Sequence, residues 1–216
     1  MIEFDLLSSL PKGKRNIKKR MTAKTEEHIR ISREYGKMYF DGPREYGYGG
    51  YNYDGRWIPV AKDIVKHFGL KKGDKVLDVG CGKGFLVKDL VSLEIDAFGV
   101  DISKYALENC EKEIVDRLSI GSADKLKFKN NSFNAVISIN TIHNLSRSNC
   151  LNAVKEIERL SPGNGFIQVD TYKNEKQKEI FESWVLTAKF YGYPNEWIKL
   201  YNEAGYTGYY YWTIIE

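Results

Sequence analysis

The sequence predicts an α/β fold: a doubly wound, mostly parallel sheet between two layers of helices, preceded by an N-terminal lid segment. Two observations support it. From residue 60 onward, short apolar runs that fit buried strands alternate with segments of helical periodicity. The first of these strands, 76–79, also runs directly into a glycine-rich turn. Ligands of such sheets lie beyond the carboxyl ends of the strands, so the functional site is expected there.

The expected elements follow in order along the chain. A helix is expected over 25–38, then an ordered loop over 39–57, because its glycines forbid a regular helix and its tyrosines forbid disorder. Pro59 opens a helix over 60–68. Further strands are expected at 76–79, 95–100, 118–120, 134–139, 165–171 and 206–215, and helices at 84–93, 103–113, 148–160 and 174–184. A seventh strand is either absent or supplied by 185–191.

The chain divides into two predicted segments. Residues 1–58 form a basic arm and a tyrosine- and glycine-rich lid, and residues 59–216 form the α/β domain. Between Pro11 and Arg33, nine lysines and arginines stand against two acidic residues. Such an arm is either a solvated leader or a contact for nucleic acid or another polyanion, and the solvated leader is favoured.

The bulk composition excludes several classes of protein. The 216 residues, with 42% hydrophobic and 29% charged side chains, are typical of a globular domain, and no apolar run reaches the roughly 18 residues of a membrane span. Residues 1–10 lack the basic start and apolar core of a secretory signal. Three cysteines without Cys-x-x-Cys spacing argue against a disulfide framework or a zinc site. We expect a cytoplasmic protein without a metal.

The glycine-rich turn is the most informative motif. It reads Val76-Leu-Asp78-Val-Gly80-Cys-Gly82-Lys-Gly84, and Asp101 follows the next strand, where a carboxylate can accept both hydroxyls of a ribose. A P-loop would need a hydroxyl residue after Lys83, and a dinucleotide motif would need a glycine in place of Phe85. The acid Asp78 would repel a pyrophosphate. The motif therefore predicts a seat for a cationic nucleoside.

This motif, with Val100-Asp101 after it, resembles the glycine-rich motif of the class I S-adenosylmethionine-dependent methyltransferases. The resemblance covers roughly residues 60–171 and implies S-adenosylmethionine as cofactor and S-adenosylhomocysteine as product. It implies that the methionine end is lined by Asp78, Gly80, Cys81, Gly82 and Gly84. Other predicted cofactor contacts are Asp101 and Ile102 at the ribose, Ala123 and Asp124 at the adenine, Asn140 after the fourth strand, and Arg56 for the cofactor's carboxylate.

Polar residues at the ends of the fourth and fifth strands are the candidates for chemistry. His143 is the candidate general base, because its pKa suits proton transfer; the alternative is that it fixes the loop backbone. Asp170 is expected to orient a cationic or hydroxylated acceptor, or merely to cap its strand. The fourth strand ends in Asn140 rather than an acid, which disfavours a metal-dependent reaction.

Aromatic residues are expected to bind the substrate. Tyrosine faces attract cations, and the predicted substrate contacts are Tyr46, Tyr48, Tyr53, His143 and Tyr172. The alternative is a tyrosine cluster that only packs across the sheet edge. A second aromatic set lies between Trp184 and Trp197. Two aromatic walls predict a small, enclosed acceptor.

The leading hypothesis is therefore a metal-independent methyltransferase that acts on an oxygen or nitrogen atom of a small molecule. Two alternatives stay open at this point. One is an RNA or protein methyltransferase recruited by the basic arm, and the other is a non-catalytic cofactor-binding subunit. Neither the acceptor nor the oligomeric state is encoded by any spacing in the sequence.

Overall fold

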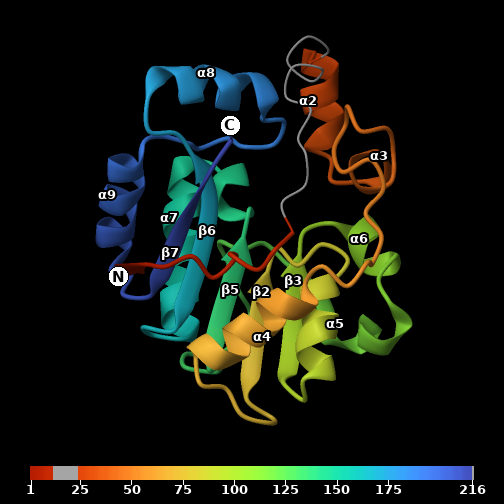
Figure 1. Ribbon diagram of the computed structural model, residues 1–216, viewed down its shortest axis with the longest axis vertical. Helices are drawn as coiled ribbons and strands as arrows, with labels where there is room; N and C mark the ends of the chain where they lie inside the picture. Colours follow the sequence, from red (N-terminus) through yellow and green to blue (C-terminus); the bar gives the residue numbers. More distant parts are fainter. Residues whose placement is uncertain (12–23, 216) are drawn as a thin grey trace.

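One parallel sheet organises the molecule (Figure 1). The computed structural model describes residues 1–11 and 24–215. In this part of the chain the sheet has seven strands in the order β1-β7-β6-β5-β2-β3-β4, and every neighbouring pair is parallel. The strands are β1 (Ile2–Glu3), β2 (Lys75–Val79), β3 (Asp96–Asp101), β4 (Leu118–Ile120), β5 (Ala135–Ile139), β6 (Gly165–Thr171) and β7 (Tyr209–Ile214).

Helices cover both faces of the sheet, which confirms the predicted three layers. They are α2 (Glu26–Ser32), α3 (Lys37–Phe40), α4 (Ile58–His67), α5 (Phe85–Ser92), α6 (Lys104–Glu108), α7 (Arg147–Leu160), α8 (Glu175–Trp184) and α9 (Pro194–Ala204), with short 3-10 helices η1 (Lys112–Arg117) and η2 (Ile142–Asn144). Side chains alternate across a strand. Thus Val76 packs with α4 and α5, whereas Leu77 packs with α7 and α9.

The strand order places the site. The chain crosses from β2 to β3 on one side and from β4 back to β5 on the other, so the direction of the order reverses at β2. Such a reversal opens a crevice beyond the carboxyl ends of the strands. In Figure 1, α8 lies at this end of the sheet above β6 and β7, and α2 and α3 lie at the same end on the side of β3 and α6.

None of the helices in residues 1–11 and 24–215 is long and apolar enough to cross a membrane.

The seventh strand comes from a place that the sequence did not indicate. Residues 185–191 form no strand, and Ile2–Glu3 instead pairs with Tyr209 and Tyr210 of β7. A two-residue strand has no periodicity to detect. The segment after it is anchored by Leu6, which is 1% exposed, and by Phe4, which stacks on His67 with ring centroids 4.3 Å apart. The first residues of the predicted arm therefore belong to the sheet.

Two predicted helices differ in the structure, and a third helix was not predicted. The helix expected over 25–38 is interrupted, because Tyr35 adopts a left-handed conformation (φ 49°) and Gly36 begins α3. The helix expected over 103–113 ends at Glu108, and η1 follows it. The helix α9, which begins at Pro194, was not expected from the sequence. Its Trp197 is fully buried in the core rather than part of an acceptor wall.

Candidate functional site

The glycine loop joins β2 to α5 at the centre of the carboxyl edge. The N–H groups of Gly80 and Cys81 both donate to the carbonyl of Val100, at 2.7 and 3.2 Å. Gly80 has φ 82°, and a Cβ there would lie 2.0 Å from Oγ1 of Thr141. Only glycine fits this position, because the loop passes directly against the start of η2.

Asp101 is held in a fixed orientation at the end of β3. One carboxylate oxygen accepts the N–H of Gly82 at 2.7 Å, and the other accepts the N–H of Ser103 at 2.8 Å. Burial raises the pKa of Asp101, and these backbone hydrogen bonds oppose the rise. The two oxygens together have about four acceptor positions, so the carboxylate can still accept from a ligand. The neighbouring Ile102 is 59% exposed. An oriented acid beside an open apolar side chain fits the ribose of a nucleoside.

Asp78 is a buried acid in the interior of β2. It is 5% exposed, and no hydrogen bond from a described residue to its carboxylate offsets the burial. Burial, together with the negative charge of Asp101, raises the pKa of Asp78 to about 7. A cation beside this carboxylate would stabilise its ionised form. The pair of acids therefore fits a nucleoside that carries positive charge.

The other predicted cofactor residues have mixed surroundings. Cys81 is buried beneath the glycine loop, and Ala123 is buried in the core. Asp124 accepts a hydrogen bond from the hydroxyl of Ser122, which leaves its second oxygen for another donor. The exposed Arg56 pairs with the carboxylate of Asp54 at 2.5 Å. That pairing competes with the predicted contact between Arg56 and the cofactor's carboxylate.

Gly84 begins the helix that follows the loop. It has φ 74°, and a Cβ there would lie 2.7 Å from the side chain of Ile114. Both its positive φ and its packing against η1 therefore require a glycine here.

Among the described residues, no three or more His, Cys, Asp or Glu side chains are grouped so as to hold a metal ion.

His143 and Asp170 are brought together by the ends of β5 and β6. The ring of His143 is 4% exposed, and its Nδ1 accepts the backbone N–H of Asp170 at 3.3 Å. Burial lowers the pKa of His143, and the charge of Asp170 acts in the opposite direction. The ring is therefore neutral at pH 7, with its proton on Nε2.

Gln168 organises this edge of the sheet, and the sequence carried no signal for it. The residue is fully buried on β6. Its Oε1 accepts the N–H of Asn140 at 3.0 Å, and its Nε2 donates to Thr213 at 2.7 Å and to Asp170 at 3.4 Å. One side chain thus ties together the carboxyl ends of β5, β6 and β7. Asn140 itself turns the chain there with φ 54°.

The tyrosine-rich segment lies over the glycine loop. The rings of Phe40 and Tyr51 would come within 3.5 and 3.4 Å of a Cβ placed on Gly82. Tyr51 stacks on Phe85 at the start of α5, with centroids 4.7 Å apart. Tyr48 stands next to Tyr51 at 4.3 Å and remains 42% exposed. We call residues 36–51 the aromatic lid. Phe40 and Tyr51 were not predicted as site residues.

The remaining tyrosines predicted for the substrate have partners elsewhere. Tyr53 donates to Asp89 at 2.5 Å, outside the aromatic lid. Tyr46 packs edge-on against His28 of α2. Tyr172 is buried against Phe181 and Tyr193, and this burial raises its pKa to about 12. Tyr46 and Tyr48 both lie in the aromatic lid, and of the tyrosines predicted for the substrate Tyr48 is the exposed one.

The N-terminal segment and the α8 segment meet above the site. Arg33 donates to the carbonyl of Ala188 at 3.1 Å, Lys24 donates to the carbonyl of Glu182, and the guanidinium of Arg44 lies 5.8 Å from the ring centre of Trp184. We call these contacts the roof contacts.

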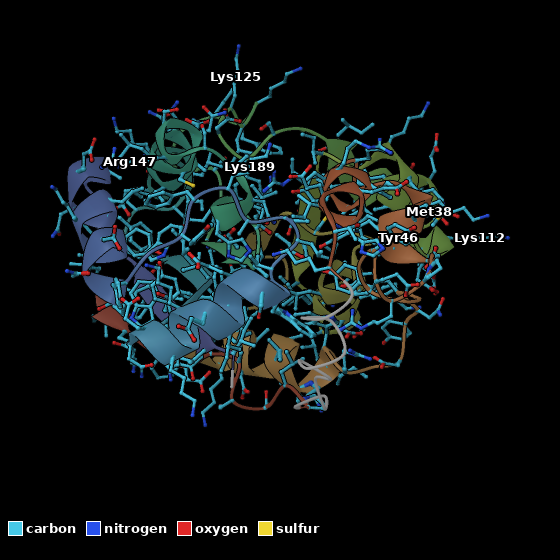
Figure 2. All side chains as sticks on the ribbon, turned by 90° about the horizontal axis from the view of Figure 1, so that it is seen from above. Met38, Tyr46, Lys112, Lys125, Arg147 and Lys189 are labelled. Carbon is cyan, nitrogen blue, oxygen red and sulfur yellow. The ribbon has the colours of Figure 1, made fainter. Side chains whose placement is uncertain are left out.

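The segment after α8 is also hydrogen-bonded to the loop that carries His143. The N–H groups of Lys189 and Phe190 donate to the carbonyl of His143 at 2.9 and 3.1 Å. Figure 2 looks down on this end of the sheet and shows Lys189 between Arg147 and Tyr46. In this view Lys189, which follows α8, lies on one side, and Tyr46 and Met38 of the aromatic lid lie on the other.

Comparisons with known proteins agree with this geometry. The model of the family described as "Methyltransferase domain" matches residues 77–169. Sterol 24-C-methyltransferase erg6 of Aspergillus fumigatus is 31% identical over 178 residues, which are 71% of this chain and 46% of that protein. Probable tRNA methyltransferase 9B of Mus musculus is 30% identical over 118 residues, 52% of this chain and 25% of that protein. This chain thus spans less than half of the length of both relatives.

A solved structure shows the same fold. It is the complex between the Haloferax volcanii Trm112 methyltransferase activator and a methyltransferase, with a TM-score of 0.55 and 22% identity over 67% of this chain and 66% of that chain. The fold, the glycine loop and the matched domain together define a class I Rossmann-like methyltransferase domain. Residues 77–169 thus match a methyltransferase domain, and S-adenosylmethionine is the cofactor that this family implies.

Proposed function

We propose that the chain transfers the methyl group of S-adenosylmethionine to an oxygen or nitrogen atom of a small molecule, without a metal. The observation that carries this proposal is the double cover of the strand ends. The aromatic lid lies over the glycine loop, and the roof contacts join the N-terminal segment to the α8 segment. A covered site excludes water and holds a small acceptor more readily than a polymer.

In this proposal, different residues bind the cofactor and orient the acceptor. The cofactor supplies a methyl group activated by its sulfonium. Asp101 orients the ribose, and Asp78 stabilises the positive charge nearby. Tyr48 offers an exposed aromatic face to the acceptor, and Asp170 offers a carboxylate that can orient a cationic or hydroxylated group. Much of the rate of such a displacement can come from this alignment.

His143 is the proposed general base for an acceptor that carries a proton. In the arrangement observed, Nδ1 accepts from Asp170 and Nε2 carries the proton. To take up a proton at Nε2, the ring has to adopt the other neutral tautomer and give up the hydrogen bond from the Asp170 N–H. The proposal therefore includes a tautomer change at His143 on acceptor binding.

The charge state of Asp78 makes cofactor binding dependent on pH. Only the ionised carboxylate attracts a sulfonium, and the pKa of Asp78 is about 7. We expect the affinity for S-adenosylmethionine to rise about tenfold between pH 6 and pH 8. S-Adenosylhomocysteine, which lacks the sulfonium charge, should show a smaller rise. Calorimetric titration of both ligands measures the difference, and Asp78→Asn should remove it. Equal pH dependence of the two ligands would contradict the role of Asp78.

The competing proposal is an RNA methyltransferase, because one relative is named as a probable tRNA methyltransferase and the arm is basic. The basic residues 12–20 lie outside the described residues. Replacing the lysines and arginines of 12–20 by glutamine separates the two proposals. We expect transfer of a radiolabelled methyl group to a panel of small alcohols, amines and carboxylic acids to stay within about twofold. Labelling of RNA by the unmodified chain, lost in the variant, would instead favour the RNA enzyme.

A further inference from the structure

A buried ion pair connects the aromatic lid to the glycine loop. Nζ of Lys83 lies 2.9 and 2.7 Å from the two carboxylate oxygens of Asp41. The two side chains are 7% and 23% exposed. Lys83 stands between Gly82 and Gly84 of the loop, whereas Asp41 follows α3 in the lid. The ion pair therefore spans two parts of the site that are distant in sequence.

The carboxylate of Asp41 also accepts hydrogen bonds from two further residues. The hydroxyl of Tyr105 on α6 donates to it at 2.7 Å, and the N–H of Tyr51 donates at 3.1 Å. Burial alone would raise the pKa of Asp41, but the hydrogen bonds from Lys83, Tyr105 and Tyr51 bring it below the usual value. The carboxylate is thus ionised at neutral pH and fixed by three elements.

The same lid reaches the second backbone donor of Asp101. Gly82, which donates to Asp101, directly precedes Lys83. Ser103, the other residue that donates to Asp101, uses its hydroxyl to bond the carbonyl of Tyr35 at 2.6 Å, just before the lid begins. One donor to Asp101 is therefore next to a residue that is paired with the lid, and the other is bonded to the residue that precedes the lid.

We propose that Asp41 and Lys83 are positioning residues that form a latch, which holds the aromatic lid on the glycine loop and thereby sets the affinity for the cofactor. The identity of the cofactor rests on the proposed function. Loss of either partner leaves the other as a charge without its counterion in a mostly buried place. Each single substitution should therefore weaken cofactor binding, and the double substitution should weaken it by less than the two single effects combined. The latch acts through Gly82 and the lid rings, not by touching the methyl group.

The test measures S-adenosylhomocysteine binding and lid opening separately. Asp41→Asn and Lys83→Met should each weaken binding by about tenfold in calorimetry, and the double variant by less than the product of the two. Hydrogen exchange without ligand should be faster at residues 36–51 in each variant. The matched control is Glu34→Gln, which removes an exposed ion pair with Arg30 in the same segment and should change neither result.

Two outcomes would overturn the latch. One is a folded Asp41→Asn variant with unchanged affinity and unchanged exchange over 36–51. The other is an exact product of effects in the double variant, which would mean that the partners act independently. Tyr105→Phe removes a donor but no charge and should weaken binding by a few-fold, so it tests the latch if Asp41→Asn does not fold. If the unaltered chain binds no S-adenosylhomocysteine, the proposed function fails, while the exchange experiment still decides on the latch.

Discussion

The Asp101→Asn variant should bind S-adenosylhomocysteine on the order of 100-fold more weakly than the unaltered chain. Hydrogen bonds to a charged group contribute about 1.5–3 kcal/mol each, and the ribose offers two hydroxyls to this carboxylate. Asparagine has only one acceptor oxygen, yet the N–H groups of Gly82 and Ser103 both point at this side chain. One of them would therefore face the donor end of the amide. Isothermal titration calorimetry measures the loss.

The control for Asp101→Asn is Asp116→Asn. Asp116 is exposed on η1, just before the amino end of β4 rather than at a carboxyl end, and its substitution makes the same change of charge. Its affinity for S-adenosylhomocysteine should be unchanged. Wild-type affinity in a folded Asp101→Asn variant would show that the nucleoside is held elsewhere.

The His143→Gln variant should lose roughly 100-fold or more in kcat, because general base catalysis by a positioned side chain contributes about 10²–10⁴-fold. Glutamine can still accept the N–H of Asp170 but cannot take up a proton at neutral pH. The KM for S-adenosylmethionine should stay within about threefold. Steady-state rates across pH 5 to 9 check both expectations once an acceptor is identified.

The pH profile separates catalysis by His143 from a structural role. Because burial lowers the pKa of His143, the neutral ring persists to lower pH than a free histidine would allow. In the unaltered chain, kcat should therefore fall only on the acidic side of 6.5, and His143→Gln should lack this fall. A variant that loses stability but keeps kcat and its pH profile would place His143 in the loop structure alone.

The lowered pKa of His143 also determines how the stability of the folded protein changes with pH. A folded-state pKa below the unfolded value means that the unfolded chain binds more protons as pH falls through 6.5. The contribution of His143 to stability is thus complete above pH 6.5 and decreases below it. Asp78 has the opposite sign: its pKa rises from 3.8 to about 7 on folding, so its ionisation destabilises the ligand-free protein as pH increases through that range.

Much of the fold follows from local sequence. The apolar runs at β2, β5 and β6 are buried on both faces, and the glycine loop with Asp101 marks the nucleoside end of the sheet. These features depend on residues within one βαβ unit, where spacing along the chain translates directly into geometry. The placement of His143 beside Asp170 also followed, because the carboxyl ends of parallel strands meet at one edge.

The remaining features depend on contacts between distant residues. Nothing in the sequence around Lys83 indicates that Asp41 is its partner, and Gln168 reads as one polar residue in an apolar strand. Trp197 was assigned to an acceptor wall because aromatic density alone does not distinguish a ligand site from a core. The left-handed Tyr35 breaks a segment whose helical pattern is otherwise continuous.

The pairing of β1 with β7 has a consequence for how the chain is made. Ile2 pairs with Tyr209, about two hundred residues later, so β1 has no strand to join until β7 has been made. Closing so long a loop is slow compared with local pairing. Until then the unpaired side of β6 and the apolar residues around Leu6 are uncovered. β1 and the segment after it therefore depend on β7 for their place in the sheet.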